Sequence, residues 1–314
     1  LMANLSIAGL MVFSLNEMEI CSMNEEFSVD PGAFDNAMEL KYLLEKFGFF
    51  QGRFIVKSPS KWVGKVYDQL IKLPDIEQAR ARSILAKNKD ALVPFGCELD
   101  SRLSWLENIH QQVQNNKISG VITNEKNEWG YPNLDEVDND YLLGGHGQRV
   151  LNKAENYTKI TRRLLELSHE IVLVDPYLAL DKSKNEKVLA SFLEVAQREK
   201  SKYFVVWARE GSGMKTKEAY QEMLETKYKP RLSKKSRLTV KLVKDKHSVN
   251  EMHARLMLSS LGGFSFDKGF AEDINEKYVD ISILDKKNYE DHYNWYLAPG
   301  SSNDFEIQEY VIEG

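Results

Sequence analysis

The sequence predicts an α/β protein with a mixed β-sheet, and two observations support this prediction. In the second half of the chain, short apolar runs alternate with amphipathic stretches at helical spacing. Strands separated by helices in this way favour an α/β layer. The first half shows the same alternation less clearly. We therefore expect a smaller α/β domain there, which is a candidate relative of the second domain.

The elements of the second half follow from their apolar patterns. Residues 170–177 form a continuous apolar run closed by Asp175 and Pro176, which is typical of a buried strand. The third expected helix ends at Pro230. The expected helices are 157–168, 187–200 and 217–228, and the expected strands are 170–177, 203–207, 238–243, a strand that begins near His253, and a final strand at 278–284.

The first half is assigned by the same criteria. The expected strands are 7–15, 53–57 and 118–123, and the expected helices are 39–47, 62–70, 76–86 and 101–114. An acidic, loop-like stretch at 133–140 is followed by glycines around His146. These features place a linker near 130–155 and predict two domains, 1–150 and 151–314.

Composition limits the classes of function. The chain has 314 residues and a formal net charge of −5. Its hydrophobic fraction of 42% is typical of a globular protein. An acidic chain is not a polyanion-binding protein as a whole, so any nucleic-acid surface must be local. No run reaches the roughly 20 apolar residues of a membrane span. The two cysteines, Cys21 and Cys97, match no zinc or redox spacing. We expect a cytoplasmic protein without a membrane partner.

The segment 252–266 holds the main candidate site. His253 and Arg255 are two residues apart at the expected start of a strand, so their side chains point to the same face. This geometry presents an imidazole and a cation to one phosphate. The downstream Gly262 and Gly263, with Ser265, can bring backbone N–H groups and a hydroxyl to the same place.

Residues 155–290 resemble the phospholipase-D superfamily, whose motif is His-x-Lys, an Asp seven residues after the His, and a Gly-Ser-x-Asn-like turn. Here Arg255 stands in place of the Lys and Ser260 in place of the Asp. A closer likeness is to a divergent branch with the run Gly-Gly-x-Ser-Phe-x-x-Gly-x-x-Glu, which corresponds to residues 262–272. Members of that branch occur in phage-defence gene neighbourhoods. The resemblance implies a mixed-sheet phospholipase-D-like C-terminal domain.

The resemblance also implies a phosphodiesterase or nuclease that acts on DNA or RNA. His253 would attack the phosphorus and form a phosphohistidine, and Arg255 would neutralise the oxygens in the transition state. Ser265 and Glu272 complete the implied catalytic set. Glu272, Asp280 or Glu276 would supply the carboxylate that Ser260 lacks. This route needs neither a metal nor another cofactor.

The implied mechanism needs a second histidine, and only His253 has a basic residue two positions later. A symmetric homodimer would supply it, because a two-fold axis brings the same strand of each subunit together. The expected partners are therefore nucleic acid, a second copy of the chain and other subunits of a defence system, in which the protein would act as an anti-phage effector.

Two alternatives stay open on the same residues. In the first, the site is catalytically degenerate and the module binds nucleic acid or a protein partner without cleaving it. Arg255 would then pair with Glu272 or Asp280 in a vestigial site. In the second, the domain binds a lipid headgroup, which is disfavoured because the sequence has no basic amphipathic membrane helix.

The expected substrate-binding residues lie at strand ends and in a basic segment. Asp175 and Tyr177 close one strand and Arg209 follows the next, where ligands of open α/β sheets bind. Asp175 could instead only cap the following turn. Residues 227–246 hold nine Lys or Arg, Lys244 and Lys246 among them, and a single acid. This segment is either a basic lip for nucleic acid or a solvated edge strand.

Overall fold

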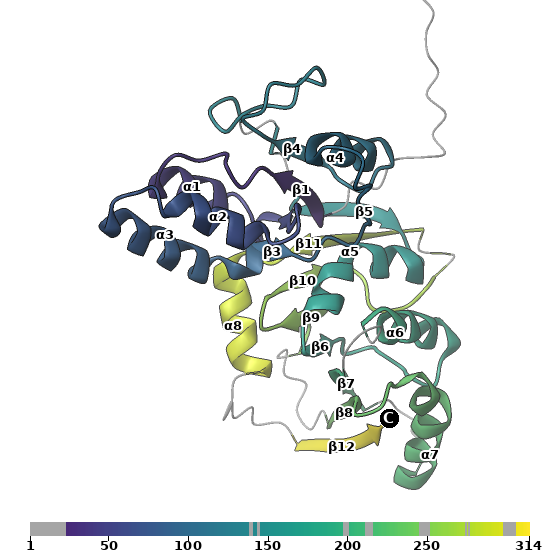
Figure 1. Cartoon of the computed structure of the whole chain (residues 1–314). Helices are drawn as coiled ribbons and strands as arrows, with labels where there is room; N and C mark the ends of the chain where they lie inside the picture. Colours follow the sequence, from purple (N-terminus) through teal and green to yellow (C-terminus); the bar gives the residue numbers. More distant parts are fainter. Residues whose placement is uncertain are drawn as a thin grey trace, which may run out of the picture.

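The computed structural model describes residues 23–137, 141–142, 145–196, 201–210, 216–244, 252–273, 275, 277–297 and 306–314. The described chain forms two β-sheets with helices packed on them (Figure 1). The mixed-sheet α/β class predicted from the sequence is confirmed. The strand expected at 7–15 lies outside the described residues.

The first sheet has the strand order β3-β2-β1-β4, and all its described pairs are parallel. Its strands are β1 (Glu25–Val29), β2 (Arg53–Val56), β3 (Leu92–Val93) and β4 (Gly120–Ile122), and its helices are α1 (Ala37–Glu45), α2 (Trp62–Leu70), α3 (Asp75–Lys87) and α4 (Trp105–Gln114). Helix α4 begins later than the sequence predicted, because Ser104 caps it. The Ser104 hydroxyl accepts from the Glu107 N–H, and the Glu107 carboxylate accepts from the Ser104 N–H, so both free donors are satisfied.

The second sheet has the order β12-β8-β7-β6-β9-β10-β11-β5. Its strands are β5 (Gly147–Leu151), β6 (Glu170–Val174), β7 (Tyr203–Arg209), β8 (Arg237–Lys244), β9 (Leu256–Ser259), β10 (Gly262–Phe266), β11 (Tyr278–Ile283) and β12 (Glu306–Glu313). Strands β6, β7 and β8 are parallel, and the remaining pairs are antiparallel.

Helices cover both faces of the second sheet. They are α5 (Ala154–Leu167), α6 (Ser183–Ala196), α7 (Lys217–Tyr228) and α8 (Lys286–Tyr296), with the short 3₁₀ turn η3 (Lys229–Arg231) after α7. In Figure 1, α5, α6 and α7 lie on one side of the sheet and α8 on the other. Parallel strands require such crossover helices, because a tight turn can join only antiparallel neighbours. Within the described ranges, no helix combines the length and apolarity needed to cross a bilayer.

The structure corrects four expectations about the elements. Strand β11 is not the last element, because α8 and β12 follow it. Strand β12 pairs with β8 along its whole length, so β8 is an interior strand and not a solvated edge. Strand β5 lies inside the expected linker and pairs with β11. Strand β9 begins at Leu256, so His253 and Arg255 precede it and lie outside any strand or helix.

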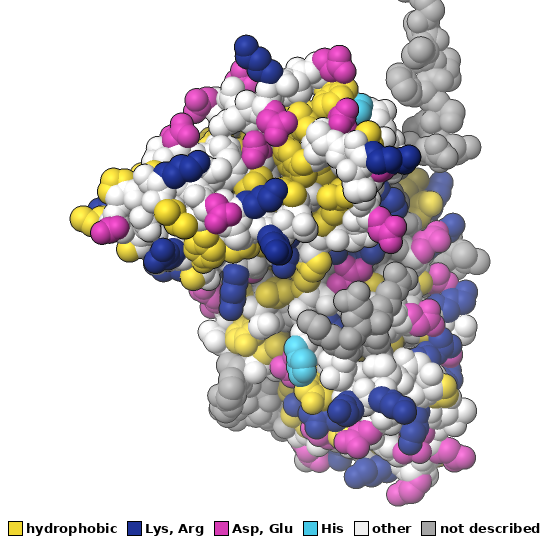
Figure 2. All heavy atoms as spheres, in the orientation of Figure 1, with side chains coloured by type: hydrophobic (Ala, Val, Ile, Leu, Met, Phe, Trp, Pro, Cys, Tyr) yellow, Lys and Arg dark blue, Asp and Glu magenta, His cyan; other side chains and the backbone are white. Residues whose placement is uncertain are grey.

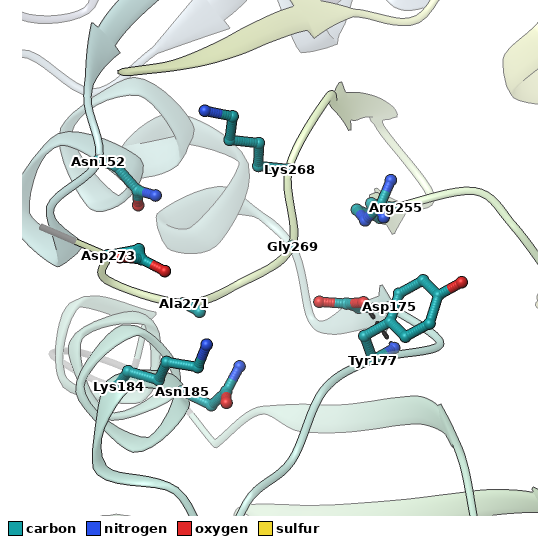
Figure 3. A pocket seen from close by; sticks show the side chains of 10 residues that line it. All are labelled: Asn152, Asp175, Tyr177, Lys184, Asn185, Arg255, Lys268, Gly269, Ala271 and Asp273. Atoms are coloured by element: carbon teal, nitrogen blue, oxygen red, sulfur yellow. Dashed lines mark hydrogen bonds between the residues drawn. The ribbon is translucent and has the colours of Figure 1, made fainter. Parts of the chain in front are cut away.

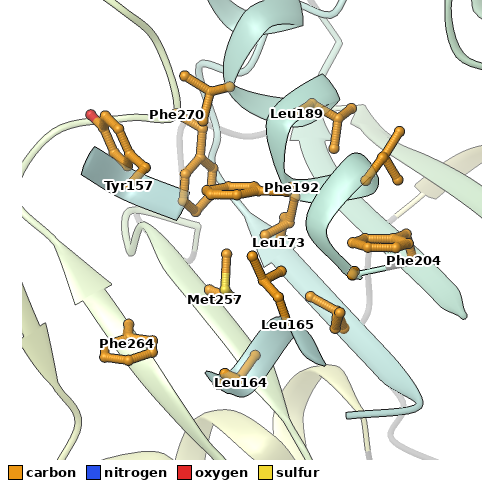
Figure 4. Close-up of a cluster of buried hydrophobic side chains, with 14 of the residues drawn as sticks. Tyr157, Leu164, Leu165, Leu173, Leu189, Phe192, Phe204, Met257, Phe264 and Phe270 are labelled. Carbon is orange, nitrogen blue, oxygen red and sulfur yellow. The ribbon is translucent and has the colours of Figure 1, made fainter. Parts of the chain in front are cut away.

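The two sheets share an apolar core. Phe49 of the first sheet's region contacts Phe264 of β10, with ring centroids 5.2 Å apart. Gly262 makes room for this contact, since a Cβ there would lie 2.1 Å from the Phe49 ring. Glu26 forms an ion pair with Arg163 of α5 across the same boundary. Figure 4 shows the part of this core that lies between α5, α6 and the second sheet.

Lys202 is a buried residue whose side chain caps the C-terminal end of α5. The residue is only 2% exposed, although lysine is rarely buried. Its ammonium donates to the carbonyl oxygens of Leu165, Glu166 and Ser168, at the C-terminal end of α5. A cation at this position satisfies carbonyls that the helix leaves without donors and interacts favourably with the helix dipole.

Candidate functional site

A polar cavity of about 230 Å³ opens at the carboxyl end of β6, where ligands of α/β sheets commonly bind (Figure 3). It is lined by Asn152, Asp175, Tyr177, Lys184, Asn185, Arg255, Lys268, Gly269, Ala271 and Asp273. The side chains come from the ends of β5 and β6, from the start of α6, from the segment before β9 and from the loop after β10. Three predicted site residues, Asp175, Tyr177 and Arg255, meet there.

Asp175 is the buried carboxylate of this cavity, with 1% exposure. One oxygen accepts the Tyr177 N–H at 2.9 Å, and the other accepts the Phe270 N–H at 2.9 Å. Burial raises the pKa of Asp175, while these two bonds and the positive charge of Arg255 act in the opposite direction. The carboxylate therefore caps the turn after β6, as one reading of the sequence proposed, and also holds the loop that follows β10.

This pKa shift predicts a pH dependence of stability. Because the pKa of Asp175 is higher in the folded protein, the folded state binds more protons than the unfolded state above pH ~4. Stability from this group is greatest at low pH and is lost as the pH rises through the folded pKa. We expect the free energy of unfolding of the wild type, minus that of Asp175→Asn, to fall as the pH rises above about 4, the ordinary pKa of an aspartate. Urea unfolding of both proteins measures it, and a difference that rises with pH would contradict it.

The loop 267–273 crosses over the end of β6 and is held from several sides. The carbonyl of Gly269 accepts from the Tyr157 hydroxyl at 3.0 Å, and the carbonyl of Phe270 accepts from the Asn185 amide at 2.9 Å. The Phe270 ring is buried in the core against Phe192 (Figure 4). Gly269 lies so close to Asp175 that a Cβ would be 2.4 Å from its Oδ2. Gly269 is therefore required by packing, because a side chain at this position would collide with Asp175.

Arg255 and Tyr177 form the mouth of the cavity. The guanidinium carbon of Arg255 lies 5.4 Å from the centroid of the Tyr177 ring, a cation–π arrangement. Nη1 of Arg255 donates to the main-chain carbonyl of Asp267 at 3.2 Å. Because this acceptor is uncharged, the hydrogen bond does not neutralise the guanidinium. Nε of Arg255 is buried and has no hydrogen-bond partner among the described residues.

The other side of the cavity mixes cations, amides and one acid. Lys184 and Asn185 lie in the first turn of α6, where the helix dipole is positive. Asn185 is 3% exposed, and its Oδ1 has no hydrogen-bond partner among the described atoms. Lys268 and Asp273 come from the loop after β10. The lining therefore holds three cations and two acids, which favours a small anion with further polar groups.

His253 is exposed and does not line this cavity. Of the described residues, no histidine lines it. Met252, just before His253, is buried, and its carbonyl accepts from Arg209 at 3.2 Å. The structure therefore brings Arg255 to the cavity, while His253 and Arg209 are placed outside its lining.

Ser265 and Glu272 also lie outside the lining. The Ser265 hydroxyl donates to the carbonyl of Ser282 at 3.4 Å, within the β10–β11 pair. One Glu272 oxygen accepts the Ala154 N–H at 3.0 Å, and the other pairs with Lys187 at 2.9 Å. Burial acts to raise the pKa of Glu272, but these two partners and the positive charge of Lys153 together outweigh it and lower the pKa. Glu272 thus caps the start of α5, in a neighbouring surface depression.

The remaining predicted site residues are separate from the cavity. Asp280 forms an ion pair with Arg149 at 3.4 Å, and Lys244 forms one with Glu306 of β12 at 3.0 Å. Lys246 and Glu276 lie outside the described residues. Neither Glu272 nor Asp280 makes the expected pair with Arg255, whose hydrogen bond goes to a main-chain carbonyl instead.

Sequence reasoning missed Asn152, Lys184, Asn185, Lys268 and Asp273 as site residues. Three of them lie beside features that the sequence does show. Lys268 precedes Gly269 of the motif, and Lys184 and Asn185 lie shortly before the expected start of a helix. Only the crossing of the loop over β6 brings these positions together. Across the described residues, no cluster of three or more His, Cys, Asp or Glu could hold a metal ion.

The fold and the cavity define an α/β protein with a small, mixed-charge polar pocket at the end of a parallel strand. No known family profile matches the chain, and no curated protein matches it. Among solved structures, the chain is similar to TrmBL2, an archaeal chromatin protein whose structure shows a novel mode of DNA binding. The identity is 12% and the TM-score 0.28, over 80% of this chain and 72% of that chain. A likeness of this degree carries no argument about function.

Proposed function

We propose that this protein binds a phosphate group of a nucleic acid or nucleotide in the cavity beside Arg255, as a phospholipase-D-like module that does not cleave its ligand. The observation that carries the proposal is the meeting of three cationic side chains, Arg255, Lys184 and Lys268, at one polar cavity. The two acids of the lining, Asp175 and Asp273, leave the cavity with an excess of positive charge. Arginine suits a phosphate, which accepts several hydrogen bonds at once.

The hypothesis that the protein cleaves a phosphodiester has less support from the residues of this cavity. A phosphohistidine mechanism needs the nucleophile within reach of the bound phosphorus, and His253 does not line the cavity. It also needs a carboxylate that orients the histidine, whereas Asp175, the buried carboxylate here, has both oxygens engaged by backbone N–H groups. Phosphodiester cleavage by His253 remains the second candidate, because His253 is exposed two residues before Arg255.

A binding assay with a matched control tests the proposal. Fluorescence anisotropy of a labelled, phosphate-terminated oligonucleotide is measured for the wild type, Arg255→Met, Arg149→Met and His253→Ala. Arg255→Met keeps much of the apolar stem and removes the charge, and we expect affinity to fall about tenfold or more. Arg149 pairs with Asp280 outside the cavity, so Arg149→Met and His253→Ala should bind within about threefold of the wild type.

The same proteins are then incubated with DNA, RNA and a generic phosphodiester in EDTA, across about pH 5 to about pH 8. The proposal expects every substrate to stay intact. Cleavage by the wild type that His253→Ala abolishes would replace this proposal with the phosphodiesterase. Equal binding by the wild type and Arg255→Met would remove the cavity as the phosphate site.

A further inference from the structure

The basic segment 227–246 meets acidic partners from neighbouring elements. Lys227 of α7 pairs with Glu186 of α6 at 2.6 Å. Arg231 pairs with Glu194 at 3.0 Å and with Glu186 at 3.7 Å. These acids come from a helix that is distant in the sequence, so the sequence of the segment alone could not show the neutralisation.

Strand β12 places glutamates opposite the cations of β8. Lys244 pairs with Glu306 at 3.0 Å. The register places Glu309 directly opposite Lys241 and Glu313 directly opposite Arg237, the arrangement in which opposite charges attract across a sheet. Figure 2 shows the same mixing on the face it draws, where Lys and Arg side chains are interspersed with Asp and Glu.

Two cations of β8, Arg237 at its first position and Lys241 in its middle, also lie over aromatic rings. The Arg237 guanidinium lies 5.0 Å from the Tyr203 centroid, and the Lys241 ammonium lies 4.7 Å from the Trp207 centroid. A row of phosphates would have to compete with these rings and with the glutamates of β12. The segment is therefore poorly suited to bind the backbone of a long nucleic acid. Affinity for such a polyanion depends on contacts with many phosphates.

Tyr177 offers a different kind of contact beside the cavity. The residue is 62% exposed, although its backbone N–H is fixed by buried Asp175. Its ring lies under the Arg255 guanidinium at the mouth of the cavity. An exposed aromatic ring held beside a cationic pocket can stack a base while the pocket holds the adjoining phosphate.

We infer that the ligand is a nucleotide with a terminal phosphate, free or at the end of a single strand, whose phosphate enters the cavity and whose base stacks on Tyr177. This inference rests on the proposed phosphate site. A cavity of about 230 Å³ suits one phosphate with adjoining sugar atoms. Three cations of the basic segment, Lys227, Arg231 and Lys244, are already in ion pairs. We therefore expect a terminal phosphate to be preferred over the backbone of a duplex.

The experiment compares a single strand of about twelve nucleotides, carrying either a terminal phosphate or a terminal hydroxyl, with a duplex that has hydroxyl ends. The phosphate is placed at the 5′ end in one set and at the 3′ end in another, and the fluorophore at the opposite end. We expect one of the phosphate-terminated strands to bind about tenfold tighter than its hydroxyl counterpart and tighter than the duplex. The slope of log K against log salt should be about −1 to −2, because one or two phosphates are neutralised.

Three variants separate the contribution of stacking from that of charge. Tyr177→Ala should weaken binding of the phosphate-terminated strand about tenfold, while Tyr177→Phe, which keeps the ring, should stay close to the wild type. Lys234→Met removes an exposed cation of the basic segment and should change binding by less than about twofold.

The outcomes distinguish this inference from the proposed function. Tighter binding of the duplex, with a salt slope of about −5 or steeper and weakening by Arg255→Met, would overturn the terminal-phosphate ligand and leave the phosphate site standing. Equal binding of phosphate and hydroxyl ends would also overturn it. If no phosphate-bearing probe binds to the wild type, the proposed function itself fails.

Discussion

Gly269→Ala is expected to destabilise the protein by about 2–4 kcal/mol and to abolish most ligand binding. The new methyl group would lie 2.4 Å from Oδ2 of Asp175, which is the oxygen that holds the Phe270 N–H. Neither side can yield easily, because Asp175 is buried and Phe270 is anchored in the core. The loop must therefore move, and it carries Lys268 and Asp273 of the cavity with it. Urea unfolding and the oligonucleotide binding assay measure the two effects.

Gly96→Ala is the matched control for this substitution. Gly96 is exposed, and a Cβ there would meet nothing within 4 Å. The free energy of unfolding of Gly96→Ala should stay within about 0.5 kcal/mol of that of the wild type. It could also rise slightly, because alanine reduces the conformational freedom of the unfolded chain. If Gly269→Ala were as stable as Gly96→Ala and bound the ligand normally, the tight packing of the loop on Asp175 would be refuted.

Lys202→Met is expected to lower the free energy of unfolding by about 2–4 kcal/mol. Methionine keeps the apolar stem but leaves the carbonyl groups of Leu165, Glu166 and Ser168 without the donor that now serves them. These groups lie at the C-terminal end of α5, where intrahelical donors are lacking. The loss should appear in urea unfolding as a lower midpoint with an unchanged slope.

Lys159→Met is the control in the same helix, because Lys159 is an exposed residue of α5. Its effect should be within about 0.5 kcal/mol. A loss of stability in Lys159→Met equal to that in Lys202→Met would show that the buried ammonium contributes nothing of its own.

Apolar spacing within short stretches of the sequence predicted several helices and strands correctly. Helix α7 covers 217–228 and helix α2 covers 62–70, as their apolar spacing predicted. The buried strand β6 was evident from its continuous apolar run. Helix α8 and strand β12 were missed for the opposite reason. Much of α8 is polar and exposed, and β12 carries glutamates on its exposed positions, so neither shows a clear apolar period.

The candidate site was predicted in part. Asp175 and Tyr177 were expected at a cleft because they end a strand, and they line the cavity with Arg255. Glu272 was expected beside Arg255, but it caps α5 instead. The run 262–272, which holds Gly262 and Gly269, was interpreted as a motif of a divergent phospholipase-D-like branch. The structure explains this pattern by packing, since Gly262 makes room for Phe49 and Gly269 for Asp175.

The sequence by itself determined the α/β class, most of the strands and helices, and the end of β6 as the position of the candidate site. Only the tertiary structure decided which charges meet. Hydrophobic periodicity acts within one element, so a single sequence reveals it. The partner of a charge depends on cross-strand register and on loops that cross between distant elements. Here β12 brings glutamates to the basic strand β8, and the buried ring of Phe270 holds the loop that completes the cavity.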